Sequence, residues 1–115
     1  YARSMEFSTN LNEFNLDFEL SEGQNYHLYL CLKEAINNAV KYSGATTLEL
    51  KYLLKSDRIE FRVADNGQGI DVTKNNMGNG IRNMQRRAEE IGAQFEIQSV
   101  LGKGVLVSLA MKIPQ

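Results

Sequence analysis

Two runs of alternating apolar and polar residues, separated by only two residues, constrain the fold of this chain most strongly. The runs are "TLELKYLLK" (Thr47–Lys55) and "RIEFRVAD" (Arg58–Asp65), and "SD" joins them. A period of two is typical of half-buried strands, so the pair predicts a β-hairpin. The second run ends on Asp65 and is followed by Gly67 and Gly69. A bare turn needs one glycine at most, so we expect something to approach the backbone closely there.

Helical periodicity appears in two longer segments. The first runs from about residue 25 to residue 42, and "SGAT" is expected to end it at Gly44. Its expected buried face comprises Leu28, Leu32, Ala35, Ile36, Ala39 and Val40. The second is "IRNMQRRAEEI" (81–91), which Gly92 should stop. Its expected buried face comprises Ile81, Met84, Ala88 and Ile91.

The remaining segments indicate further strands. We expect one at 14–20 ("FNLDFEL"), and a hairpin from "QFEIQSV" (94–100) and "VLVSLAMKI" (105–113) around the turn "LGKG". Residues 1–13 are assigned to a linker or a short edge strand near Met5 and Phe7, and residues 14–115 to one domain. The predicted fold is α+β, a two-layer α/β sandwich whose mixed, mostly antiparallel sheet is covered by helices on one face.

Composition bounds the function. The chain has 115 residues, of which 43% are apolar and 23% charged, and its formal net charge is -1. This balance gives no general attraction for nucleic acid or an anionic membrane, so we expect no direct nucleic-acid binding. No apolar run approaches the roughly 20 residues that span a bilayer, and no signal peptide is visible. The single cysteine, Cys31, lies among apolar residues and is expected to be a buried structural thiol.

Three polar residues of the first helical segment form a candidate site. Glu34, Asn38 and Lys41 are spaced by four and three residues, which places them along one stripe of a helix. A carboxylate and an amide oxygen are suitable ligands for Mg²⁺, and a lysine one turn further can reach phosphate oxygens. The alternative interpretation is an ordinary solvated helix face.

The glycine-rich segments form a second candidate site. Asp65 at a strand end is either a turn-capping acid or an acceptor for an exocyclic amine such as that of adenine. "GNGI" (78–81) leads into a helix, where free N–H groups can hold phosphate, although an ordinary loop explains it equally well. The only histidine, His27, is expected to be a surface or packing residue.

The order of four motifs is more specific than any one of them. "KEAINNAVKYSGA", "ADNGQGI", "GNGIRNMQRRAEEIGA" and "GKGV" follow one another along the chain. This arrangement resembles the HATPase domain (Bergerat fold, GHKL group) of bacterial two-component sensor histidine kinases, and the subgroup partnered with helix-turn-helix response regulators looks nearest. The resemblance covers residues 14–113, which is nearly the whole chain.

The resemblance implies roles for residues of the first motif. Asn38 would hold Mg²⁺, and Glu34 would sit beside the metal or the γ-phosphate. Lys41 would meet phosphate and, with Glu34, would take part in catalysis. Tyr42 would pack on the adenine side.

The later motifs would complete an ATP site. Asp65 would accept from the adenine amine, with Gly67, Gly69 and Ile70 beside it. An ATP lid would span residues 71–79, with Gly78 near its end and Gly80 and Ile81 directly after it. In place of the threonine that often follows the family's last G-x-G, this chain has Val105, which offers no hydroxyl for a water-mediated contact to adenine.

The implied function is to bind Mg·ATP and donate its γ-phosphoryl group to a histidine on a dimerisation domain, for onward transfer to a response regulator. His27 does not sit in the pattern of that acceptor, so the isolated chain is not expected to phosphorylate itself. The resemblance also implies a cytoplasmic location for this domain, and it leaves open whether the parent protein is anchored in a membrane. The alternatives are another Bergerat-fold protein (an anti-sigma serine kinase or an ATPase) and an ATP-binding module without phosphotransfer.

Overall fold

A computed structural model describes residues 5–10, 20–42, 44–69, 80–100 and 102–113, without the side chains of residues 41 and 42. In chain order the elements are β1 (Glu6–Thr9), α1 (Glu22–Tyr42), β2 (Thr47–Lys55), β3 (Arg58–Asp65), α2 (Gly80–Glu90), β4 (Gln94–Val100) and β5 (Gly104–Lys112). The strand expected at 14–20 lies outside the described residues, except for Leu20. A strand is present near Met5 and Phe7, where a short edge strand was one of the two expectations.

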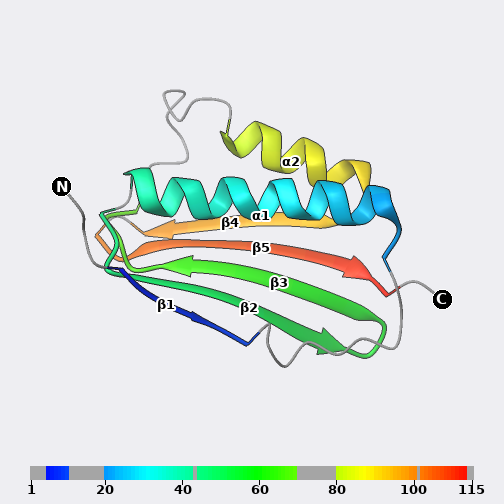
Figure 1. The fold of residues 1–115 in the computed structure, drawn as a ribbon, viewed down its shortest axis with the longest axis horizontal. Coiled ribbons are helices and arrows are strands. Elements are labelled where there is room, and N and C mark those ends of the chain that lie inside the picture. The colour runs from blue at the N-terminus through cyan, green and yellow to red at the C-terminus, as the bar shows by residue number, and fades with distance from the viewer. Residues whose placement is uncertain (1–4, 11–19, 43, 70–79, 101, 114–115) are drawn as a thin grey trace.

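The five strands form one sheet in the order β1-β2-β3-β5-β4 (Figure 1). β1 pairs with β2 in parallel, and the other three pairs are antiparallel. Both helices lie over the same face of the sheet (Figure 1). The predicted α+β architecture, with a mixed, mostly antiparallel sheet covered on one face, is confirmed. The hairpin of β2 and β3 around Ser56 and Asp57 is also confirmed.

The hydrophobic core fills the space between the helices and the sheet. Alternate residues of the three central strands point toward the helices and are buried: Leu48, Leu50, Ile59, Phe61, Val63, Val107, Leu109 and Met111. The helices contribute Leu28, Cys31, Ala35, Ala39, Met84 and Ala88. The small size of Cys31, Ala35 and Ala39 lets α1 pack closely on the sheet. Burial of Cys31, at 1% exposure, confirms the expected structural thiol.

α1 begins three residues earlier than the apolar periodicity predicts. The Ser21 hydroxyl oxygen accepts a hydrogen bond from the Gln24 N–H at 3.1 Å, and the Gln24 side-chain oxygen accepts one from the Ser21 N–H at 2.8 Å. This reciprocal pair is a capping box, which satisfies two N–H groups at a helix start. "SEGQ" therefore forms the cap and first residues of α1, and the expectation that the helix starts near residue 25 was wrong.

The expected position of Val40 was also wrong. This residue was expected on the buried face of α1, but it is 60% exposed. An α-helix turns by about 100° per residue, so each step of four residues advances the side chain by about 40°. Three such steps from buried Leu28 rotate Val40 by about 120°, off the face that packs on the sheet.

No helix in the described part of the chain is long and apolar enough to cross a membrane.

The glycines expected to end the helices do so. Gly44 follows α1 and has φ +65°. After α2, the N–H of Gly92 donates to the Glu89 carbonyl at 3.1 Å, and the N–H of Ala93 donates to the Ala88 carbonyl at 2.9 Å. This pattern is the Schellman motif, in which the residue after the helix is left-handed.

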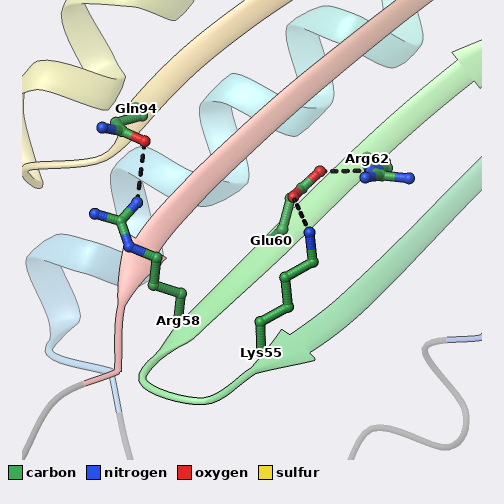
Figure 2. A network of polar contacts seen from close by, with 5 residues as sticks. All are labelled: Lys55, Arg58, Glu60, Arg62 and Gln94. Atoms are coloured by element: carbon green, nitrogen blue, oxygen red, sulfur yellow. Dashed lines mark hydrogen bonds and ion pairs between the residues drawn. The ribbon is translucent and has the colours of Figure 1, made fainter.

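The sheet face opposite the helices is polar. Figure 2 shows Arg58 reaching across β5 to the Gln94 side chain, at 3.0 Å, and Glu60 lying between Arg62 and Lys55. A hollow of about 220 Å³ lies on this face, and its lining comprises Lys55, Arg58, Glu60, Gln94, Glu96, Ser108 and Ala110. Charged side chains on a sheet face keep it hydrated, which explains how this face can be stable although no described helix or strand covers it.

Candidate functional site

The candidate site residues gather at the end of the sheet where β3 stops. Asp65, the last residue of β3, is half-buried, and its Oδ1 accepts a hydrogen bond from the Gly67 N–H at 2.8 Å. Its Oδ2 has no hydrogen-bond partner among the described residues. The carboxylate is therefore fixed by one oxygen and can accept a further hydrogen bond through the other.

Asn66 is a residue whose role the sequence did not reveal. Its Oδ1 accepts from the N–H groups of Thr46 and Thr47, at 2.9 and 2.8 Å, and its Nδ2 donates to the Thr46 hydroxyl oxygen at 2.9 Å. Its own N–H donates to the Thr47 carbonyl at 3.4 Å. Asn66 thereby ties the end of β3 to the start of β2. An asparagine directly after a strand was the available signal, but its partners lie about 20 residues away.

Gly69 answers the question raised by the two glycines after Asp65. A Cβ on Gly69 would lie 2.5 Å from the Val100 carbonyl oxygen and 3.1 Å from the Ser99 hydroxyl oxygen, and its φ of +76° disfavours any side chain. The Gly102 N–H donates to the Gln68 carbonyl at 2.6 Å. The close approach at Gly69 is thus by the chain's own β4–β5 turn. A part in adenine binding for Gly69, and for buried Gly67, stays a prediction.

Gly104, the first residue of β5, also approaches backbone closely, at the end of β3. A Cβ on Gly104 would overlap the Asp65 carbonyl oxygen and would lie 3.1 Å from the Asn66 Cα. The "GKG" segment was expected to be a simple hairpin turn, and it does lead into β5. Its second glycine also lets β5 start directly against Asp65. The backbone at the end of β3 is therefore enclosed by β2 through Asn66 and by β5 through Gly104.

A second group of candidate residues lies where α1 contacts the start of α2, and it comprises Glu34, Asn38 and Gly80. A Cβ on Gly80 would lie 3.3 Å from the Asn38 Nδ2 and 3.4 Å from the Glu34 Cδ. Gly80 is the first residue of α2, so a carboxylate and an amide from α1 lie beside the N-terminus of α2. A helix N-terminus carries partial positive charge, which favours both the Glu34 carboxylate and an added phosphate. The structure brings together candidates that are about 40 residues apart in sequence.

The other candidates are located only in part. Ile81 is half-buried and packs against the core. Lys41 and Tyr42 lie in the last turn of α1, but their side chains are outside the described part. Ile70, Gly78 and the predicted lid at 71–79 are likewise outside it.

His27 lies where α1 faces α2. The His27 Nδ1 lies 3.3 Å from the Arg87 Nη1, and the Arg87 guanidinium lies 5.5 Å from the centre of the Tyr26 ring. His27 therefore packs between the helices, as expected of a packing residue. Within the described residues, no three His, Cys, Asp or Glu side chains cluster to form a metal site.

Cys31 connects the helix pair to the candidate site. Its thiol donates to the Met84 carbonyl of α2 at 3.7 Å. Burial, and secondly the Glu34 carboxylate one turn along α1, raise the pKa of this thiol from 9.0 to about 12. The thiol therefore stays protonated in the folded chain over the whole neutral range.

We expect Gly69→Ala to destabilise the chain far more than Gly102→Ala. Both positions have positive φ, but the added Cβ meets no atom within 4 Å at Gly102, whereas at Gly69 it meets the Val100 carbonyl. Gly102→Ala should cost roughly 1 kcal/mol for the backbone alone. Gly69→Ala should cost roughly 2–4 kcal/mol because overlap is added. Urea unfolding measures both, and equal losses would contradict the close approach at Gly69.

The Cys31 thiol predicts a pH dependence of stability. Because its pKa is raised on folding, the native state keeps a proton that the unfolded chain loses above about pH 9. The contribution is therefore complete below pH 9 and is lost as the pH rises toward 12. At pH 10.5 the loss should reach about 2 kcal/mol. Comparing the stability-pH curves of the wild type and Cys31→Ala removes the contribution of other titrating groups, and parallel curves would contradict the shift.

Comparison with known proteins agrees with this geometry. The family model described as "Histidine kinase-, DNA gyrase B-, and HSP90-like ATPase" (HATPase_c) matches residues 23–115. The sensor protein VraS of Staphylococcus aureus (strain COL) is 35% identical over 94 residues, which cover 81% of this chain and 27% of the relative. VraS of Staphylococcus epidermidis shows the same identity and coverage. The chain thus spans about a quarter of the length of these relatives.

Solved structures share the fold. The histidine kinase domain of the blue-light activated kinase EL346 from Erythrobacter litoralis superposes with a TM-score of 0.79 at 18% identity, covering 96% of this chain and 52% of that chain. The ATP-binding domain of PrrB from Mycobacterium tuberculosis superposes with a TM-score of 0.73 at 20% identity, covering 99% of this chain and 84% of that chain. From the matched family model, the chain belongs to the HATPase_c family of histidine kinase-, DNA gyrase B- and HSP90-like ATPases and is an ATP-binding domain.

Proposed function

We propose that this chain is the catalytic ATP-binding domain of a two-component sensor histidine kinase. The observation that carries the proposal is the meeting of Glu34 and Asn38 with Gly80 at the N-terminus of α2. The 35% identity to VraS, a sensor protein, supports a kinase parent over the other members of the family. Residues 14–115 would form the domain, and residues 1–13 would be a linker that also supplies β1.

Asp65 would select adenine. Its Oδ1 is held by the Gly67 N–H, and Oδ2 is left to accept a hydrogen bond from the exocyclic amine. A hydrogen bond to a charged group contributes more than a neutral one, so this contact would discriminate between purines. Ile70 and Tyr42 are proposed to lie against the ring.

The contact between α1 and the start of α2 would hold the phosphates. The free N–H groups at the start of α2 would bind phosphate oxygens, and Gly80 leaves room because it has no side chain. Glu34 and Asn38 provide one carboxylate and one amide, the hard oxygen donors that suit Mg²⁺. When bound, Mg²⁺ would neutralise charge on the phosphates. Glu34 and Asn38 are proposed to hold it, with Lys41, Gly78 and Ile81 completing the phosphate end.

The phosphoryl acceptor would be a histidine on the dimerisation domain of the parent protein. His27 contacts both Arg87 and Tyr26, and it precedes Glu34 by seven residues, about 10 Å along a helix. It is therefore poorly placed to receive a phosphoryl group in line. We further propose a cytoplasmic location, a parent with a membrane anchor, and a response regulator of the helix-turn-helix class as the final acceptor.

We expect Asp65→Asn to weaken ATP binding at least about tenfold, because a charged acceptor contributes about 1.5–3 kcal/mol. GTP should be affected much less, because guanine presents a carbonyl at that edge. Calorimetric titration of both nucleotides measures the difference.

Asp57→Asn is the matched control, because Asp57 is an exposed acid at the opposite end of β3. It should leave both affinities unchanged. An equal loss of ATP and GTP affinity in Asp65→Asn would contradict the adenine assignment.

We expect the chain to transfer an acid-labile label from γ-labelled ATP to the dimerisation domain of its parent, and not to itself. Asn38→Leu removes an oxygen donor next to Gly80. It should abolish transfer and the part of ATP affinity that depends on Mg²⁺, which titrations with and without Mg²⁺ measure.

Asn37→Leu changes the same residue type one position earlier on α1, on the side that lines the groove between the helices. It should retain Mg²⁺-dependent binding. ATP binding without transfer to any acceptor would favour a non-catalytic module, and equal changes with and without Mg²⁺ in Asn38→Leu would exclude Asn38 as a ligand.

A further inference from the structure

We propose that Asn66 is a positioning residue for Asp65, and that it fixes the orientation of the proposed adenine-binding carboxylate by joining the end of β3 to the start of β2. This inference rests on the proposed role of Asp65. Asn66 itself is not assigned a contact with nucleotide. Its effect would be exerted through the backbone that carries Asp65.

Within the described part of the chain, the side chain and the backbone N–H of Asn66 bond to one dipeptide. The side chain makes three, to the N–H of Thr46, the N–H of Thr47 and the Thr46 hydroxyl, and the backbone N–H adds a fourth to the Thr47 carbonyl. An asparagine side chain is well suited to this task because it has an acceptor that takes two bonds and a donor at the same site.

The dipeptide is itself held in place. The Thr46 carbonyl accepts from the Glu6 N–H of β1 at 2.8 Å, and Ala45, immediately before it, is 1% exposed. Thr46 follows the end of α1 by four residues. Asn66 therefore anchors the Asp65 backbone to a point that β1 also holds.

The opposite side of Asp65 is also restricted. Gly104 of β5 lies so close that a Cβ there would overlap the Asp65 carbonyl. Without the Asn66 side chain, the end of β3 would keep its pairing with β2 and its backbone bond to the Thr47 carbonyl, but it would lose the three side-chain bonds that hold it to the start of β2. A small rotation there would misdirect Oδ2, because a hydrogen bond weakens steeply when its angle departs from linearity.

The test compares ATP with purine riboside triphosphate, an analogue that lacks the exocyclic amine. The ratio of the two dissociation constants reports the amine contact alone. An unfolded fraction weakens both ligands equally and leaves the ratio unchanged, so a merely structural role would not move it. We expect Asn66→Ala to lower the preference for ATP at least about fivefold. We expect Asn66→Asp, which keeps acceptors for both N–H groups, to retain most of the preference.

Asn10→Ala is the matched control. The Asn10 side chain also makes two hydrogen bonds to the β2 backbone, both to Tyr52, at 3.1 and 3.0 Å. Asp65 is paired with Leu48, and Tyr52 lies four residues further along β2, about 13 Å away. Loss of these bonds should cost stability but leave the preference for ATP as in the wild type.

The outcomes separate this inference from the proposed function. If Asp65→Asn lowers the preference and Asn66→Ala does not, or if Asn10→Ala lowers it equally, the positioning role is wrong while the adenine site stands. If Asp65→Asn leaves the preference unchanged, both are wrong. If Asn66→Ala and Asp65→Asn each lower it and the double variant is no worse than Asp65→Asn alone, the two residues act through the same contact.

Discussion

The close packing of backbone at the end of β3 is the constraint on which the candidate site depends. Three segments converge there: the start of β2, the loop after Asp65, and the β4–β5 turn. Side chains are excluded at two positions because the added Cβ of Gly69 or Gly104 would meet a carbonyl oxygen. Polar backbone groups in such a junction must find partners, and Asn66, Gln68 and Gly102 supply them. The Asp65 carboxylate is consequently held on a rigid frame.

The candidate site also depends on the close approach of α1 to the sheet and to α2. Cys31, Ala35 and Ala39 are small and buried, so the helix axis lies near the sheet. The Cys31 thiol reaches the Met84 carbonyl of α2, and Glu34, one turn later, arrives at the N-terminus of the same helix. The same packing that raises the pKa of the thiol thus places a carboxylate where the helix dipole favours it. The close packing of α1 therefore both stabilises the core and sets the electrostatic environment of Glu34.

The sequence was sufficient to predict the helices and strands that local residue patterns determine. Alternation defined the β2–β3 hairpin to the residue, and both helices were found with their glycine terminators. The start of α1 was missed because a capping box is polar and carries no apolar periodicity, and Val40 was misplaced because a row of residues four apart drifts around the helix. The role of Asn66 and the neighbours of Gly69 could not be inferred, since both depend on segments distant in sequence. The ordered motifs named the candidate site residues, but only the fold brings Gly80 against Glu34 and Asn38.

The two parts of the candidate site are connected by a short structural path. In sequence, Asn38 and Asp65 are 27 residues apart, with the whole β2–β3 hairpin between them. Through Asn66, the distance shortens to the few residues that link the end of α1 to Thr46. A ligand that contacts both parts would therefore meet two groups whose relative position this path restricts before the ligand binds. Fixing such groups in advance reduces the entropy lost on binding and holds the reacting end in a defined position. The same path makes the two parts interdependent, because a shift at the start of β2 would move Asp65 relative to the α1–α2 contact.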